Sequence, residues 1–236
     1  LYNFGFPVPP GFIITTEIFR YRQIIDSFTP AKENLREQLT RHIEQMEHAT
    51  GKRFGYAKNP LLFSVRSGSS ISQPGMMETF LDVGINEEVT RGLSHYYQNE
   101  WFAWDSYRRF LQCYGMALDI QRNDFDDIIA GFKRHWGIPL KRELSGKQMQ
   151  KVAKTYKRYI EDQGHQIPDD PFDQLLATIE AVIESWDSAK AKSYRNIMGI
   201  SDDWGTAITV QTMVFGNLST DSGSGVVFIH NQRWTG

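Results

Sequence analysis

The middle of the chain carries apolar residues at helical spacing, and the segments on both sides of it have the pattern of β-strands. In the first stripe the spacings are 3, 4, 3 and 4, which places all apolar side chains on one helix face. This stripe consists of Trp104, Tyr107, Leu111, Tyr114 and Leu118. Two similar stripes follow, consisting of Met149, Val152, Tyr156 and Tyr159, and of Leu175, Ile179, Val182 and Trp186. We therefore predict a helical layer over residues 97–200.

The flanking segments predict the strands of an α/β unit. Short runs of apolar and β-branched residues favour strands over residues 12–15, 61–66, 80–83 and 226–229. A long central strand is expected over 207–215, because residues alternate there with period two: Ala207, Thr209, Gln211, Met213 and Phe215 share one face. A helix from Glu17 to about His48 should break near Pro30, since proline removes a backbone donor. The expected division is 1–96 and 204–236 for the α/β part and 97–203 for the helical part.

Composition restricts the class of protein. The chain has 236 residues, of which 40% are apolar and 23% charged, so it should form a folded core. A net charge of -2 gives no overall electrostatic reason to bind nucleic acid or a membrane surface. Cys113 is the single cysteine, and no apolar run approaches the ~20 residues that span a bilayer. We expect a cytoplasmic protein, and a piece of a longer one, since the sequence starts at Leu1 without a signal-peptide pattern.

Arg66 ends a predicted buried strand and opens onto a loop rich in serine and glycine, within "SVRSGSSISQPGMMETF" at 64–80. A guanidinium group forms bidentate bonds with phosphate oxygens, and glycines such as Gly68 and Gly75 let backbone N–H groups approach an anion. Hydroxyl donors are offered by Ser67, Ser69, Ser70, Ser72 and Thr79. The loop is not a Walker A sequence. The residues alone leave two alternatives open: a phosphate site, or a solvated loop with Arg66 in a surface ion pair.

Gln211 is a polar residue in an otherwise apolar strand. A buried amide without partners costs roughly 1–3 kcal/mol, so something should satisfy it. Either a ligand base or ribose on the same face as Met213, or a neighbouring backbone group, would serve.

Other polar residues favour structural roles. The six histidines show neither an H-x-x-x-H pair nor a Cys/His cluster, so the sequence gives no zinc-site signal. Asp105, Arg108 and Arg109 lie at spacings that allow ion pairs along one helix. The basic run at 141–158 has acidic neighbours and a Tyr/Val stripe, which is typical of a solvated helix face.

Five segments together resemble the nucleotide-binding domain of the pyruvate, phosphate dikinase family, in matching order and over nearly the whole chain. They are "VPPGFIIT" at 8–15, "LLFSVRSGSS" at 61–70, "PGMMETFLDVGIN" at 74–86, "WDSYRRFLQCYG" at 104–115 and "GTAITVQTMVFGN" at 205–217. The resemblance implies an α+β, ATP-grasp-like nucleotide-binding domain with a large helical insertion. It also implies binding of Mg-ATP and transfer of a phosphoryl group to a histidine on a separate swivelling domain, and from there to pyruvate, giving phosphoenolpyruvate.

The resemblance also assigns residues. Arg66 would clamp the transferring phosphates as the catalytic residue, Gly75 and Thr79 would belong to the glycine-rich lid, and Gln211, with Met213, would line the adenine side. The family's lysine lies upstream of this chain and its magnesium ligands lie beyond Gly236, as do the carrier domain and the pyruvate-binding barrel. We expect the piece alone to be inactive and its parent to be a homodimer.

The resemblance leaves the final acceptor open. A phosphoenolpyruvate synthase or an antibiotic phosphotransferase would use the same ATP chemistry on another acceptor, and a degenerate, non-catalytic nucleotide-binding scaffold is a further alternative. His230 and Gln232 stand where the family usually has arginine and proline, which bears on the last alternative.

Overall fold

A four-stranded antiparallel sheet organises the computed structural model, which describes residues 2–68 and 75–225. The strand order is β1-β6-β4-β5, so the last strand of the described residues lies inside the sheet between two earlier ones. The strands are β1 (Gly11–Ile14), β4 (Phe63–Gly68), β5 (Thr79–Val83) and β6 (Ala207–Thr212). A separate parallel pair is formed by β2 (Arg53–Phe54) and β3 (Pro60–Leu61).

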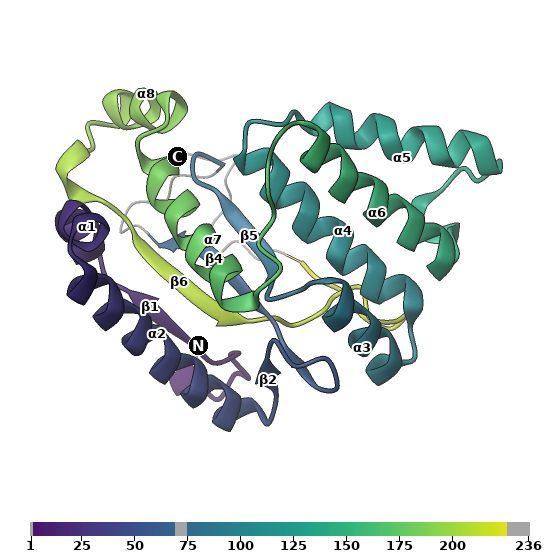
Figure 1. Ribbon diagram of the computed structural model, residues 1–236, viewed down its shortest axis with the longest axis horizontal. Helices are drawn as coiled ribbons and strands as arrows, with labels where there is room; N and C mark the ends of the chain where they lie inside the picture. The colour runs from purple at the N-terminus through teal and green to yellow at the C-terminus, as the bar shows by residue number, and fades with distance from the viewer. Residues whose placement is uncertain (1, 69–74, 226–236) are drawn as a thin grey trace.

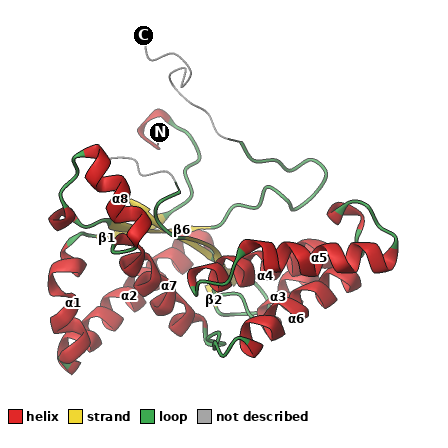
Figure 2. Ribbon diagram, turned by 90° about the horizontal axis from the view of Figure 1, so that it is seen from above, coloured by secondary structure: helices red, strands yellow, loops and turns green. Residues whose placement is uncertain are grey.

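Helices supply most of the remaining structure. They are α1 (Glu17–Ser27), α2 (Thr29–Thr50), α3 (Glu87–Tyr97), α4 (Glu100–Ala117), α5 (Arg122–Trp136), α6 (Gly146–Asp162), α7 (Pro171–Trp186) and α8 (Ala189–Met198). Short 3-10 turns span Tyr2–Phe4, Lys141–Glu143 and Asp202–Trp204. Figure 2 shows α2, α4 and α7 on one side of the sheet, with the N-terminal loop and the chain that follows β6 on the other.

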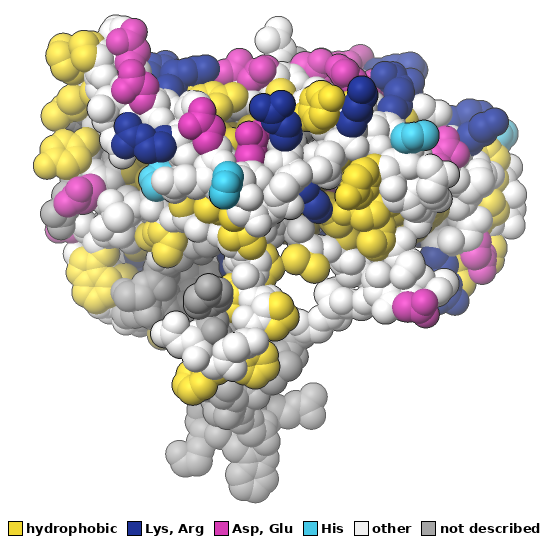
Figure 3. Space-filling view, turned by 90° about the horizontal axis from the view of Figure 1, so that it is seen from below, with side chains coloured by type: hydrophobic (Ala, Val, Ile, Leu, Met, Phe, Trp, Pro, Cys, Tyr) yellow, Lys and Arg dark blue, Asp and Glu magenta, His cyan; other side chains and the backbone are white. Residues whose placement is uncertain are grey.

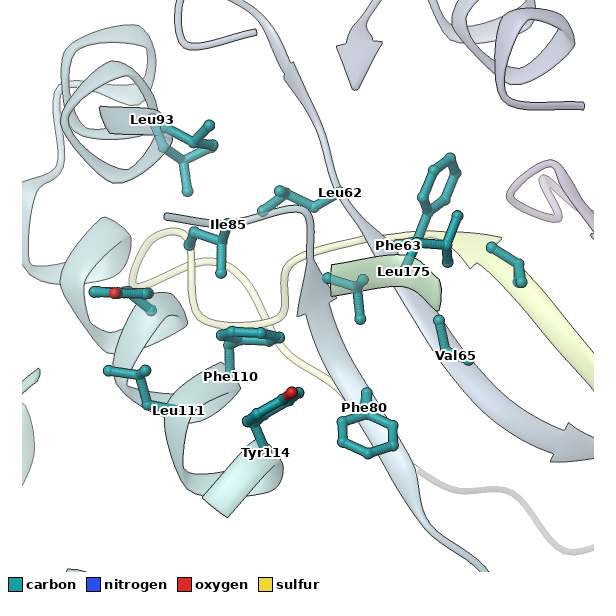
Figure 4. Packing of buried hydrophobic residues seen from close by; sticks show 14 of the residues in the cluster. Leu62, Phe63, Val65, Phe80, Ile85, Leu93, Phe110, Leu111, Tyr114 and Leu175 are labelled. Carbon is teal, nitrogen blue, oxygen red and sulfur yellow. The ribbon is translucent and has the colours of Figure 1, made fainter. Parts of the chain in front are cut away.

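The core lies between the sheet and these helices. The strands send Phe12, Phe63, Val65, Phe80, Ile208 and Val210 into it, and all are buried. Figure 4 shows Phe110 and Tyr114 of α4 beside Phe80, and Leu175 of α7 near Phe63. Because side chains alternate along a strand, the residues between these apolar ones project from the opposite face, which we call the open face.

Several sequence predictions are confirmed. The three apolar stripes lie on α4, α6 and α7, except that Leu118 is the residue that follows the end of α4. The predicted break near Pro30 is the boundary between α1 and α2, with Pro30 in the first turn of α2. Proline is accepted there because the first helical N–H groups have no intrahelical partner. The predicted helical layer begins earlier than residue 97, since α3, which packs on α4, starts at Glu87.

The prediction of a strand over 207–215 is too long, because β6 ends at Thr212. The next N–H, that of Met213, still donates to the carbonyl of Leu62 at 2.9 Å. The Phe215 ring then packs against Phe102, with ring centroids 4.9 Å apart, so aromatic contacts with the helices replace continued strand pairing. The predicted strand 226–229, and with it His230 and Gln232, lies outside the described residues.

Surface charge is mixed on the face that Figure 3 presents, where basic and acidic side chains are interspersed over the helical half. None of the helices in the described ranges is both long enough and apolar enough to cross a bilayer.

Candidate nucleotide-binding site

One row of side chains crosses the open face of the sheet. In the strand register Arg66 of β4 lies opposite Thr209 of β6 on one side and Thr79 of β5 on the other. Ile13 of β1 extends the row beyond Thr209 and is 65% exposed. Arg66 and Thr79 are also exposed, while Thr209 is half-buried. Three adjacent strands therefore present one cation flanked by two hydroxyl groups.

A hydrogen-bonded chain of three residues orients Arg66. Its Nη2 donates to Oε1 of Gln211 at 2.7 Å, and Nε2 of Gln211 donates to the carbonyl oxygen of Pro9 at 2.9 Å. The buried-amide question is thus answered within the chain, since both ends of the Gln211 amide have protein partners. The guanidinium group is tied to a fixed neighbour and has further N–H groups with which to bind an anion.

Glycines lie at both described ends of the loop. Gly75 has φ of 69°, in the left-handed region that L side chains rarely adopt, and so suits a backbone that must turn there. At the other end, a Cβ on Gly68 would lie 3.2 Å from the Thr209 hydroxyl oxygen. The absence of a side chain at Gly68 therefore keeps that hydroxyl uncrowded. Residues 69–74, which include Ser69, Ser70 and Ser72, lie outside the described residues.

The site residues expected from the sequence are brought together to different degrees. Arg66, Thr79 and Gln211 lie on neighbouring strands of one face, and Gly75 precedes Thr79 by four residues. Met213 follows the end of β6, and its side chain is half-buried against the hydrophobic core. Thr209 had no role in the sequence analysis. Its signal was its position, two residues before Gln211 on the same strand face.

The donor set suits an anion. A guanidinium group, hydroxyl groups and glycine backbone are the groups that proteins use for phosphate oxygens. By contrast, the described ranges contain no group of three or more His, Cys, Asp or Glu side chains that could hold a metal ion. The described residues of this row thus fit the phosphates of a nucleotide.

Ionisable groups on the helical side of the sheet serve the structure. Oδ1 of Asp105 lies 2.8 Å from Nε of Arg108, which confirms an ion pair expected along α4. Nζ of Lys141, from the 3-10 turn that precedes α6, lies 3.0 Å from the same oxygen. Burial alone would raise the pKa of Asp105, but Arg108 and Lys141 together hold it below its ordinary value. Asn217 also donates to this carboxylate, at 3.3 Å. The cluster joins α4 to the chain that follows β6.

Comparisons with known proteins point to one family. A family model described as "Pyruvate phosphate dikinase, AMP/ATP-binding domain" matches residues 20–236. The chain is 38% identical over 230 residues to a pyruvate, phosphate dikinase from Clostridium symbiosum, covering 96% of this chain and 26% of that protein. It is 42% identical over 231 residues to one from Rhizobium meliloti (strain 1021), covering 97% and 26%. A rice protein, "Pyruvate, phosphate dikinase 2", is 41% identical over 231 residues, again covering 97% and 26%. The chain spans about a quarter of the length of these relatives.

Proposed function

Because the chain belongs to the family of pyruvate phosphate dikinase AMP/ATP-binding domains, we propose that the open face of its sheet binds the phosphates of ATP. The observation that carries this proposal is the position of Arg66. Its guanidinium group is exposed, flanked by Thr79 and Thr209, and oriented by Gln211 at 2.7 Å. The family name on its own would fit several sites, but this row combines a fixed cation with hydroxyl donors on either side.

The chemistry asked of these residues is positioning and charge stabilisation. In phosphoryl transfer the protein has little covalent work, and catalysis depends on fixed charge placed where the transferring group develops it. Arg66 supplies that charge and Thr79 and Thr209 donate to phosphate oxygens. The backbone N–H of Gly75, at the described end of the loop, offers a further donor to the same oxygens. Magnesium, when bound with the nucleotide, would neutralise phosphate charge.

For the whole protein we extend the proposal to the reaction in the relatives' name. The phosphoryl group from ATP would pass to a carrier histidine on another domain and then to pyruvate, giving phosphoenolpyruvate. In this proposal the present chain supplies part of the ATP site and is inactive alone. The carrier domain and a pyruvate-binding barrel are its functional partners within a homodimeric parent. The ATP-grasp-like assignment of the fold belongs to the same proposal and is supported by the antiparallel sheet with helices on one side.

Calorimetric titration of Mg-ATP into the chain tests the site. Substitution Arg66→Ala should weaken binding about ten- to a hundredfold, since a hydrogen bond to a charged group contributes about 1.5–3 kcal/mol. Arg91→Ala is the matched control, because Arg91 is an exposed arginine on α3 that pairs with Glu87 at 3.0 Å. It should leave the affinity unchanged. Equal affinity in wild type and Arg66→Ala would remove Arg66 from the site. No binding by wild type, either as this chain or as a version extended at both ends, would favour a degenerate scaffold.

A further inference from the structure

We propose that the corner between α7 and α8 positions the end of the loop that leads into Thr79 of the nucleotide site, with Lys190 and Ser185 as positioning residues. We call residues 75–78 the loop end, since they lead directly into Thr79 of β5. The proposal rests on the proposed function, because it names what holds that site in place. Figure 1 shows α8 beside the end of the sheet at which β6 begins. Arg66 lies toward the same end, since Gly68 of β4 pairs with Ala207.

Two hydrogen bonds join the corner to the loop end. Nζ of Lys190 donates to the carbonyl oxygen of Gly75 at 2.5 Å. The backbone N–H of Glu78 donates to Oγ of Ser185 at 3.3 Å. The sulfur of Met77 lies 3.8 Å from the same serine oxygen. The loop end is thus held at its first and last residues by side chains more than 100 positions further along the chain.

The serine contact is directional because Ser185 is itself fixed. It is 8% exposed, and its hydroxyl donates to the carbonyl of Val182 at 2.7 Å within α7. With its proton used there, the oxygen has lone pairs for the N–H of Glu78. Burial raises the pKa of the Glu78 carboxyl, and the positive charge of Lys190 opposes that rise. Lys190 therefore acts on the loop end by its charge as well as by its hydrogen bond.

The buried side chain of Arg195 joins α8 to the end of α7 and to Asp202. Arg195 is fully buried, and its Nη1 donates to the carbonyl of Trp186 at 2.6 Å, at the end of α7. Its Nε donates to Oδ1 of Asp202 at 2.6 Å, and its guanidinium carbon lies 4.0 Å from the centroid of the Trp186 ring. Asp202 also accepts a bond from the Trp186 indole at 3.1 Å through its carbonyl oxygen. A loop bonded to this corner is bonded to a fixed platform.

Such a platform matters because ordering a loop costs conformational entropy, about 1–2 kcal/mol for each backbone residue fixed. If the loop end were free, binding of the phosphates would have to supply this free energy. A loop end that is already held binds its ligand more tightly for the same contacts. Gly75 makes the support more important, since a glycine backbone has more conformations to lose.

Lys190→Met tests the inference, because it removes the ammonium group and keeps an unbranched apolar chain of similar length. We expect Mg-ATP affinity to fall about five- to tenfold and amide hydrogen exchange at residues 76–79 to accelerate. Lys190→Arg, which restores a cationic donor, should recover most of both. Lys192→Met is the matched control, since Lys192 lies on the same helix and pairs with Asp187 at 3.5 Å. It should leave affinity and exchange unchanged, and the unfolding midpoint should stay constant in all three variants.

Two readouts separate this inference from the proposed function. Unchanged affinity in Lys190→Met would overturn it, even if exchange accelerates, because the contact would then have no effect on the site. If wild type fails to bind Mg-ATP, both as this chain and as a version extended at both ends, the proposed function falls. The exchange measurement then decides on the inference by itself. Faster exchange at 76–79 in Lys190→Met and in Ser185→Ala, but not in Lys192→Met, would support the corner as the support of the loop. Unchanged exchange in both variants would overturn it.

Discussion

Gln211 has contacts within the protein that suggest a second possible role in the site. The family resemblance implies that Gln211 lines the adenine side of the nucleotide. In the structure its amide oxygen accepts from Arg66 at 2.7 Å and its amide nitrogen donates to Pro9 at 2.9 Å. An amide that uses both ends within the protein is well suited to hold a neighbouring cation. The geometry therefore favours an effect of Gln211 on phosphate binding through Arg66.

Gln211→Ala should consequently weaken Mg-ATP and inorganic tripolyphosphate by similar factors, about three- to tenfold, since a typical hydrogen bond contributes about 0.5–1.5 kcal/mol. Competition calorimetry with the two ligands measures both factors. Gln38→Ala is the control, because Gln38 is an exposed glutamine that bonds Asn34 within α2. A loss confined to ATP, with tripolyphosphate unchanged, would restore the adenine-side role and contradict the role through Arg66.

At the scale of elements, the sequence was informative wherever the structure depends on local pattern. The stripe on α4 was readable because burial of one helix face imposes the spacing of its apolar residues. The end of β6 could not be read from the sequence. The alternation of residues with period two continues to Phe215, although the strand ends at Thr212 and the chain turns toward Phe102. That turn depends on a tertiary contact between rings more than 100 residues apart.

In the candidate site too, features that depend on local sequence could be predicted, and contacts between distant residues could not. Arg66 was identifiable, since a cation at the end of a strand before a Ser/Gly loop is a local feature. Its neighbour Thr209 required the strand register, and the bond from Lys190 to Gly75 joins residues 115 positions apart. No local spacing encodes such a contact, so the support of the loop could come only from the structure.

The packing of β5 on α4 buries an acidic group. Asp82 is 1% exposed, has a left-handed φ of 62°, and its Oδ1 finds no hydrogen-bond partner among the described residues. Burial raises the pKa of its carboxyl to about 7, against an opposing effect of Arg109. On the same helix, Asp105 adds to the rise of the Asp82 pKa and Arg108 opposes it. The charge of Asp82 in turn contributes to the raised pKa of the Cys113 thiol on α4. The β5–α4 contact is therefore sensitive to protonation.

The sign of this effect follows from the two pKa values. The unfolded chain loses the Asp82 proton near its ordinary pKa of 3.8, while the folded protein keeps it until about 7. The contribution of Asp82 to the free energy of unfolding is therefore fully present below the lower value. This stabilising contribution is lost as the pH rises through the folded-state pKa of about 7, by up to about 4 kcal/mol.

Asp82→Asn removes the ionisation and keeps a residue type that tolerates left-handed φ. We expect its free energy of unfolding, relative to wild type, to increase by roughly 2–3 kcal/mol between pH 5 and pH 8. Urea unfolding at several pH values measures this difference. Asp127→Asn, at an exposed aspartate on α5, should show no such trend. A difference between Asp82→Asn and wild type that stays constant with pH would show that Asp82 is ionised alike in both states.

In the whole molecule, α4 joins the sheet to three other helices. It packs on β5 and also on α3, α5 and α6. The close approach is possible at Gly115, where a Cβ would lie 2.6 Å from the Phe125 ring and 3.2 Å from Ile160. Helix α7 likewise packs on β4 and β5. We proposed a division of the sequence into segments 1–96, 97–203 and 204–236. Because the helices and strands of these segments pack on one another, we expect them to unfold as one cooperative unit.

Two matched substitutions test this cooperativity. Ile160 on α6 and Ile208 on β6 are both fully buried, and Ile→Ala at such positions costs about 2–5 kcal/mol. If the layers form one unit, Ile160→Ala should lower the native-state hydrogen-exchange protection of β6 amides as much as that of α6 amides, and Ile208→Ala should do the same in reverse. An α6 that loses protection while β6 keeps it would show that the helical segment opens independently. In that case the division at residues 97 and 203 would be a division in folding as well as in sequence.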